Sequence, residues 1–210
     1  MLIDIAVGTF GSEDWEKKNA ALCEQMSTLN SVNRVISVHS TSLEKARNSA
    51  ARMSNADYII FLDADDFLDD SYVEVMARAA SKAERPTIFK PMTRGFYESG
   101  DSDPEAIFIP NRDMFTSNSC VIGSMVSRLD FLSVGGFKEY PILEDWELFL
   151  NLICNADCKI RPVRNAVYCI NVRSGSRNTD QSLHGKIYSD IVNQYRDFSK
   201  FVKDIYLEEI

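Results

Sequence analysis

The stretch Tyr58-Ile59-Ile60-Phe61-Leu62-Asp63-Ala64-Asp65-Asp66 places five apolar residues directly before a cluster of three aspartates. An unbroken apolar run of this length, bounded by polar residues, is typical of a strand that is buried on both faces. Such strands belong to α/β sheets, which bind ligands beyond the carboxyl ends of their parallel strands. The stretch therefore predicts an α/β fold with a ligand site beside the aspartates.

The three carboxylates repel one another unless a cation, a proton or hydrogen-bond donors compensate their charge. Asp63 and Asp65 alternate along the chain, so both point to the same side of an extended backbone. This pattern indicates a site for Mg²⁺ or Mn²⁺ that is held by one or two carboxylates and completed by substrate phosphates. The alternative is a strand end followed by an ordinary helix cap, because Asp is a common N-cap residue.

Strand and helix patterns alternate before this stretch. Residues 2–7 and 34–39 read as strands, and apolar residues at helical spacing predict a helix over 15–29 and another around Arg47. This order favours right-handed crossovers and a mixed, mainly parallel sheet flanked by helices. The other expected elements are a helix over 71–82, a strand at 86–89, an irregular segment over 92–111, a strand over 119–126, a buried helix from about 144, a strand over 166–170 and a helix over 184–206.

Further candidate ligand residues lie at the ends of these elements. The turn Gly8-Thr9-Phe10-Gly11 either lets a nucleotide approach the backbone or is an ordinary connection. Arg47 either reaches a phosphate or a base, or lies in solvent. Arg173 and Arg177 stand among glycine, serine and asparagine, where they either clamp a phosphate or belong to a solvated loop.

Composition narrows the class of protein. The 210 residues are 45% hydrophobic and 26% charged, which is ordinary for one large globular domain. The net charge of -8 argues against an extended nucleic-acid footprint. Five cysteines without CxxC spacing indicate reduced thiols, and two histidines do not spell out a zinc site. Because neither a signal peptide nor an apolar segment of about 20 residues is evident, we expect a soluble, cytoplasmic protein.

Three blocks in order carry a resemblance to a known family. Ala46-Arg47-Asn48, the stretch 58–66, and Gly135-Gly136-Phe137 leading into Glu144-Asp145-Trp146 together resemble a GT-A glycosyltransferase of family 2. The resemblance spans about residues 3–178, and the opening turn is similar to short actinobacterial and phage members. We expect a GT-A domain over residues 1–182. A C-terminal helix over 183–210 would pack on this domain or form a homodimer interface.

The resemblance implies an inverting, metal-dependent transfer of a sugar from a nucleotide-sugar, with a UDP-sugar as the expected donor, to an acceptor hydroxyl. It places Mn²⁺ or Mg²⁺ on Asp65 and Asp66, and makes Asp145 the general base with Glu144 beside it. Trp146 would line the acceptor site. The expected contacts to the nucleotide-sugar are Gly8, Thr9, Phe10, Arg47, Asp63, Arg173 and Arg177.

The sequence departs from the family pattern at two places. The family commonly has a further strand after the first helix, which ends in acids that read the nucleobase. Here the strand over 34–39 ends in His39-Ser40-Thr41 and runs directly into the helix of Arg47, so this reader is deleted and the base is left open. Arg173 stands where many members have a histidine close to the metal. Arginine cannot ligate a metal ion, but it can pair with a phosphate.

Two other functions fit part of the sequence pattern. Haloacid-dehalogenase phosphatases also end a strand in Asp-x-Asp, with the first Asp as nucleophile, but their motif opens the chain and continues differently from Asp66-Phe67. A non-catalytic module that binds a sugar or nucleotide-sugar is the second alternative, and the intact Asp65 and Asp145 favour the enzyme over it. The acceptor is left open among a glycan, a lipid-linked sugar, a protein side chain and a DNA base.

Overall fold

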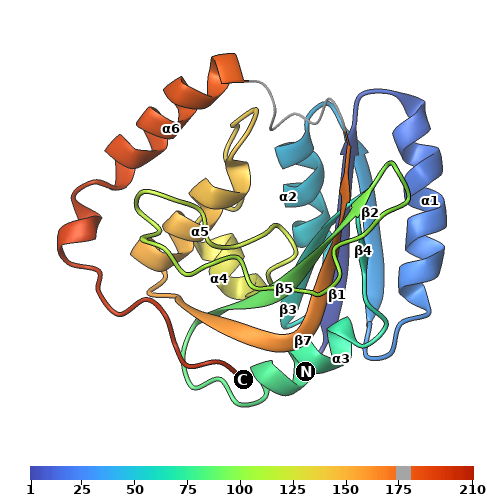
Figure 1. Ribbon diagram of the computed structural model, residues 1–210, viewed down its shortest axis with the longest axis horizontal. Helices are drawn as coiled ribbons and strands as arrows, with labels where there is room; N and C mark the ends of the chain where they lie inside the picture. The colour runs from blue at the N-terminus through green and yellow to red at the C-terminus, as the bar shows by residue number, and fades with distance from the viewer. Residues whose placement is uncertain (174–180) are drawn as a thin grey trace.

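The computed structural model describes residues 1–173 and 181–210 of the chain, which form two sheets and the helices around them (Figure 1). In the first sheet, β1 (Ile3–Phe10) lies between β2 (Arg34–Ser40) and β3 (Tyr58–Asp63) and runs parallel to both. The short β6 (Val126–Ser127) pairs antiparallel with β3 at the edge. The mainly parallel α/β sheet predicted from the sequence is therefore confirmed.

The second sheet is small and has the order β4-β7-β5. Its central strand is β7 (Lys159–Val172), which pairs parallel with β5 (Thr87–Tyr97) and antiparallel with β4 (Phe67–Leu68). Because β4 begins directly after Asp66, the aspartate cluster forms the connection from the first sheet to the second. Both sheets therefore meet at the carboxyl end of β3.

Helices cover both faces of the first sheet. In Figure 1, α1 (Glu13–Ser27) and α2 (Leu43–Met53) lie on opposite sides of the parallel strands. Ala46, Ala50 and Ala51 of α2 are fully buried, and such small side chains let a helix pack closely on a sheet. The other helices are α3 (Tyr72–Ala80), α4 (Arg128–Ser133), α5 (Glu144–Asn155), α6 (Gln181–Tyr195) and the 3₁₀ turn Phe198–Lys200.

Two of the three sequence blocks that carry the family resemblance, the one with Asn48 and the one with Phe137, contact each other. The side chain of Asn48 makes two hydrogen bonds to the backbone of Phe137, at 2.8 and 2.9 Å. Gly136 has a φ of +73°, and a Cβ there would lie 2.3 Å from the Asn48 amide oxygen. The Phe137 ring packs edge-on against Phe61 of β3. The glycine and the asparagine of these blocks therefore fix α2 to the segment that leads into α5.

Two predicted strand boundaries were wrong. β5 continues to Tyr97 through the segment that we expected to be irregular, with a register shift between Lys90 and Met92 around a proline that has no N–H to donate. The expected strand over 119–126 is instead a turn, of which only the last residue enters β6. At this turn Gly123 faces the ring of Tyr168, which would lie 2.1 Å from a Cβ.

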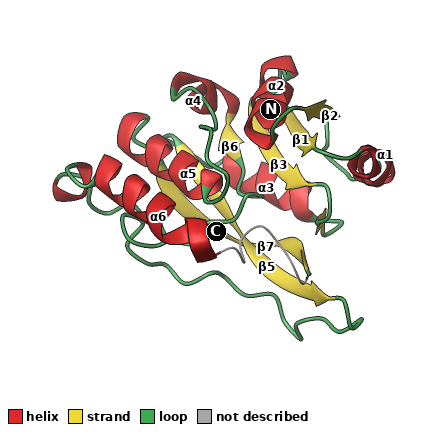
Figure 2. Cartoon of the chain, turned by 90° about the horizontal axis from the view of Figure 1, so that it is seen from above, coloured by secondary structure: helices red, strands yellow, loops and turns green. Residues whose placement is uncertain are grey.

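The expected helix over 184–206 was also wrong in its second half. α6 ends at Tyr195, and the side chains of Ile187, Ile191 and Tyr195 on this helix are buried. The helix lies beside α5 in both views (Figure 2). The chain then runs along β7, where the Ile160 N–H donates to Ile205 at 2.7 Å. No helix in the described parts of the chain has the length and apolar character needed to cross a membrane.

Candidate active site

The carboxylates that follow β3 lie at the edge where its parallel neighbour β1 also ends. Asp63 is the last residue of β3 and is paired in register with Gly8 of β1. The backbone turns sharply after it, because the Asp66 N–H donates to the carbonyl of Asp63 at 3.0 Å. This turn sets the carboxylates at the carboxyl edge of the parallel strands, which is the edge where such sheets usually bind ligands.

Arg47 connects this edge to the first turn of α5. One terminal nitrogen of its guanidinium makes a short ion pair with Asp63, and the other lies 2.9 Å from Glu144 Oε1. The arginine is only 1% exposed, and a Cβ on Gly8 would lie 2.9 Å from its Cγ, so that Gly8 makes room for it. Burial alone would lower the pKa of Arg47, but the two carboxylates raise it. The guanidinium thus fixes Asp63 and Glu144 to each other.

Asp65 and Asp66 have different surroundings. Asp66 is buried, and its two carboxylate oxygens accept hydrogen bonds from the Tyr168 hydroxyl and the Asn171 N–H, both at 2.8 Å. Burial, and then the charge of Asp63, raise the pKa of Asp66 to about 7. Asp65 is 30% exposed with Arg173 at 3.9 Å, and its pKa is also raised by burial and by Asp63. Asp65 is therefore the more accessible of the two carboxylates.

Asp66→Asn is expected to change how stability depends on pH. The folded-state pKa of about 7 lies above the unfolded value of about 3.9, so the stabilising contribution of Asp66 is present below about pH 4 and is lost as pH rises through 7. The free energy of unfolding of the variant, measured relative to that of wild type in EDTA, should therefore rise by roughly 2–4 kcal/mol from pH 4 to pH 8. Urea unfolding across this range checks it, with the exposed Asp70→Asn as control. A constant difference between variant and wild type would contradict it.

Asp145 lies in the first turn of α5 and is partly exposed. Its Oδ1 accepts the Trp146 N–H at 2.8 Å, and its Oδ2 accepts the side-chain amide of Asn118 at 3.2 Å. Burial and the neighbouring charge of Glu144 raise the pKa of Asp145 to about 6. The carboxylate is therefore largely ionised at neutral pH but holds a proton more readily than an ordinary aspartate, which suits a proton acceptor.

Trp146 faces the interior of the protein. It is 2% exposed, its indole N–H donates to the Met114 carbonyl at 2.8 Å, and its ring packs on Tyr188 of α6 with centroids 5.4 Å apart. The Trp146 side chain therefore anchors the first turn of α5 to the protein interior. We expected the Trp146 side chain to line the acceptor site, but its packing does not favour an open contact with an acceptor.

The remaining expected ligand residues lie around the ends of β1 and β7. Thr9 is buried and its hydroxyl is 3.0 Å from Nδ1 of His39 at the end of β2, while Phe10 is 36% exposed. Arg173 follows β7 beside Asp65. Arg177 lies outside the described residues.

A divalent cation fits this edge of the sheet only if other ligands complete its coordination. Burial, and then the charge of Asp63, raise the pKa values of Asp65 and Asp66, so a bound cation would favour the ionised form of both carboxylates. Within residues 1–173 and 181–210, no set of three or more histidine, cysteine, aspartate or glutamate side chains is arranged to hold an ion. One or two carboxylates joined by phosphates and water are a usual arrangement for Mg²⁺.

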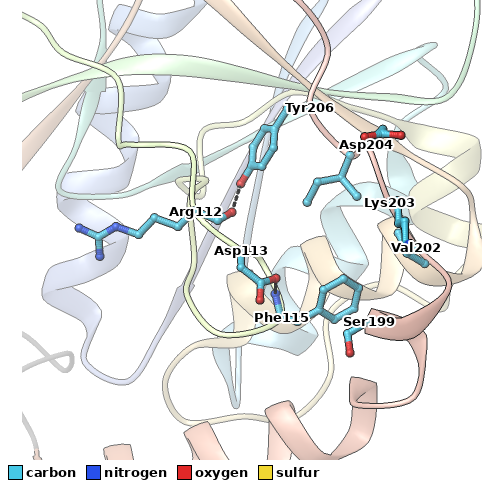
Figure 3. A pocket seen from close by; sticks show the side chains of 9 residues that line it. Arg112, Asp113, Phe115, Ser199, Val202, Lys203, Asp204 and Tyr206 are labelled. Atoms are coloured by element: carbon cyan, nitrogen blue, oxygen red, sulfur yellow. Dashed lines mark hydrogen bonds between the residues drawn. The ribbon is translucent and has the colours of Figure 1, made fainter.

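A cavity of about 600 Å³ lies elsewhere, between the C-terminal segment and the turn that contains Arg112 and Phe115 (Figure 3). None of the residues discussed above as candidate ligands or catalytic groups lines it. The candidate site is therefore the carboxylate edge and not this cavity.

Three residues of the site were missed by sequence reasoning. Tyr168 and Asn171 hold Asp66 from more than a hundred residues away, and Asn118 contacts Asp145 from a turn that was expected to border a strand. Only Asn171 carried a signal, because it is a polar residue directly after a predicted strand.

Known proteins resemble this chain in sequence family and in fold. Residues 17–124, more than half of the chain, match the model of glycosyl transferase family 2. The solved structure of S. aureus TarS 1–349 in complex with UDP-GlcNAc is 14% identical and superimposes with a TM-score of 0.65 over 91% of this chain. The corresponding complex with UDP is 13% identical, with a TM-score of 0.59 over 95% of this chain and 73% of that one.

At such low identity these likenesses show the fold, which is the expected GT-A fold. The chain spans 64% of the TarS fragment solved with UDP-GlcNAc. No curated protein sequence matches the chain. With the family model covering the strand that ends in the aspartates and the helix that carries Arg47, the chain belongs to glycosyl transferase family 2.

Proposed function

We propose that the chain transfers a sugar from a nucleotide-sugar to an acceptor hydroxyl, with inversion at the anomeric carbon and with a divalent cation. The observation that carries this proposal is the buried Arg47, which joins Asp63 at the end of β3 to Glu144 in the first turn of α5. This contact holds the cluster suited to a diphosphate next to Asp145, the residue suited to take a proton. Membership of family 2 supports the same reaction.

The donor diphosphate would lie beside Asp65. Asp65 and Asp66 would hold Mg²⁺ or Mn²⁺, and Arg173 would pair with a phosphate oxygen. When bound, the cation stabilises the negative charge that grows on the departing diphosphate. Because TarS structures contain UDP and UDP-GlcNAc, a UDP-sugar is the proposed donor. The donor nucleoside would lie at the end of β1, where Thr9 and His39 are hydrogen-bonded and Phe10 is exposed.

The transfer itself needs one base and one displacement. Asp145 would accept the proton of the acceptor hydroxyl as that oxygen forms a bond to the anomeric carbon. The bond from this carbon to the diphosphate oxygen breaks, and the electron pair leaves with the nucleoside diphosphate. A single displacement from the face opposite the leaving group inverts the configuration. Glu144 and Trp146 would act by positioning, through Arg47 and the Met114 carbonyl.

We further propose that residues 1–182 form the transferase unit and that residues 183–210 pack on it. Tyr195 of α6 donates a short hydrogen bond to Glu147, which is fully buried in α5 and also pairs with Lys138. Tyr188 of the same helix covers Trp146. These contacts support a C-terminal segment that braces the helix carrying Asp145.

A panel of UDP-, GDP-, dTDP- and CMP-sugars, each with Mn²⁺ and with EDTA, tests the donor assignment by thermal unfolding. A ligand at about 100 times its dissociation constant stabilises a protein by roughly 2.7 kcal/mol. We expect a shift with UDP-sugars in Mn²⁺ that EDTA removes. A cooperative unfolding transition that no donor moves would contradict the proposal.

Asp65→Ala is expected to abolish the metal-dependent part of this shift, because it removes the more exposed of the two proposed metal ligands. Asp70→Ala is the matched control, since Asp70 is an exposed aspartate five residues along the chain. Calorimetric titration of UDP in Mn²⁺ gives the affinity of each variant. An unchanged affinity in Asp65→Ala would show that the cation is held elsewhere.

A further inference from the structure

Asp145 receives a hydrogen bond from a residue that lies outside the family blocks. The amide nitrogen of Asn118 is 3.2 Å from Asp145 Oδ2, while the other carboxylate oxygen accepts the N–H of Trp146. Each oxygen of Asp145 thus has one donor within the protein. Together the two donors fix the rotation of the carboxylate about its Cβ–Cγ bond.

The orientation of the Asn118 amide is set by its backbone surroundings. Its oxygen accepts the N–H of Cys120 at 3.0 Å, so the nitrogen is the atom that faces Asp145. An amide turned the other way would place its oxygen against a carboxylate and leave the Cys120 N–H opposite a donor. Asn118 is therefore held as a donor toward Asp145.

The turn that carries Asn118 is anchored on several sides. The indole of Trp146 donates to the Met114 carbonyl, and the Tyr188 hydroxyl donates to the Thr116 carbonyl at 3.1 Å. The hydroxyl of Tyr206 donates to the Arg112 carbonyl at 2.5 Å, the contact drawn in Figure 3. The C-terminal part of the chain thus fixes the turn in front of α5.

We propose that Asn118 is a positioning residue for Asp145, which holds the carboxylate in one orientation and favours its ionised form without adding a charge to the site. The proposal rests on the proposed function, in which Asp145 is the base. A neutral donor suits this place, because a lysine or arginine would bind a carboxylate too tightly for it to accept a proton at neutral pH.

The charged and titratable groups around Asp145 come from four parts of the chain. Burial raises the pKa of Asp145 most, Glu144 on its own helix and Asp63 at the end of β3 raise it further, and Arg47 of α2 lowers it. The buried Cys120 lies on the same turn as Asn118, and its own raised pKa keeps it neutral. The Asn118 amide opposes burial and the two acids, since it donates to the charged form of Asp145.

Three variants test this assignment. Asn118→Ala removes the donor, and Asn118→Asp keeps the shape but replaces the donor by an acceptor. Ser117→Ala is the control, because it changes the neighbouring side chain, which makes no hydrogen bond to Asp145. The pKa of Asp145 is measured from its carboxyl ¹³C shift across pH 4 to 9. The kcat for UDP release from UDP-GlcNAc is measured over the same range.

We expect the pKa of Asp145 to rise by about one unit in Asn118→Ala and further in Asn118→Asp, and to stay unchanged in Ser117→Ala. The acid limb of the kcat profile should move by the same amount, with about ten-fold slower release at pH 5.5 and recovery at pH 8. An unchanged Asp145 pKa in both Asn118 variants would overturn the proposal.

The two measurements also separate this proposal from the proposed function. If the pKa moves while the acid limb of the kcat profile stays in place, Asn118 still positions Asp145 but Asp145 is not the base. If wild type releases no UDP, the ¹³C titration alone decides the role of Asn118. If the ¹³C titration gives the same Asp145 pKa in wild type and in both Asn118 variants, the positioning role of Asn118 is contradicted, whether or not the protein is active.

Discussion

Asp145→Asn is expected to lower the rate of sugar transfer by at least about 100-fold while leaving the dissociation constant of the donor nearly unchanged. The amide cannot accept the proton of the acceptor hydroxyl, so the nucleophile is no longer activated. The Asp145 contacts lie on α5 and the Asn118 turn, whereas the proposed diphosphate site lies beside Asp65 and Arg173. This variant should therefore keep donor binding while its rate of sugar transfer falls.

Rates of UDP release from UDP-GlcNAc and calorimetric titration with UDP in Mg²⁺ provide this comparison. Glu139→Gln is the matched control, because it removes an exposed carboxylate shortly before α5. An Asp145→Asn variant that binds UDP as wild type does but does not turn over would support the role of base. A variant that loses UDP binding together with turnover would make Asp145 a donor ligand instead.

Arg47→Met is expected to destabilise the fold by about 3 kcal/mol and to abolish transfer. Methionine replaces the stem of the arginine but leaves Glu144, which is buried, facing Asp63 without the cation between them. The guanidinium attracts both carboxylates, and breaking a buried ion pair from one side is strongly destabilising. We take the lower end of the usual range because Asp63 is 31% exposed.

A double-mutant cycle separates this charge effect from a loss of packing. Glu144→Gln removes one of the two carboxylates, so the variant with both substitutions should lose less stability than Arg47→Met alone. Arg47→Lys keeps the charge without the two-pronged geometry and should lie between wild type and Arg47→Met. Urea unfolding of the four proteins of the cycle measures the coupling. Additive losses would mean that Arg47 acts through packing and not through the two acids.

The sequence predicted the parallel sheet and the carboxylates at its edge because both depend on local pattern. The apolar run that ends at Asp63 fixed the buried strand, and the expected order of strands and helices followed from alternating periodicities. The boundaries of β5 and α6 were wrong because they depend on distant partners. β5 extends to Tyr97 only because β7 lies beside it, and α6 ends at Tyr195 because the tail after it pairs with β7.

The partners of the site residues were beyond sequence reasoning for the same reason. Arg47 was expected to contact the nucleotide, yet its guanidinium is buried between carboxylates 16 and 97 residues away along the chain. Nothing in a single sequence distinguishes an arginine that faces a ligand from one that is buried between two acids. The residue type predicts the charge and the hydrogen-bonding capacity of a side chain, but tertiary packing decides which partner that side chain contacts.

The stereochemistry of donor hydrolysis tests the central claim most directly, because it requires no knowledge of the acceptor. UDP-GlcNAc carries its sugar in the α configuration, and proton NMR at early times identifies the anomer of free sugar before it equilibrates. A single displacement assisted by Asp145 predicts that wild type releases the β anomer first and that Asp145→Asn releases sugar at least about 100-fold more slowly. Release of the α anomer first, or turnover in Asp145→Asn close to the wild-type rate, would contradict the account.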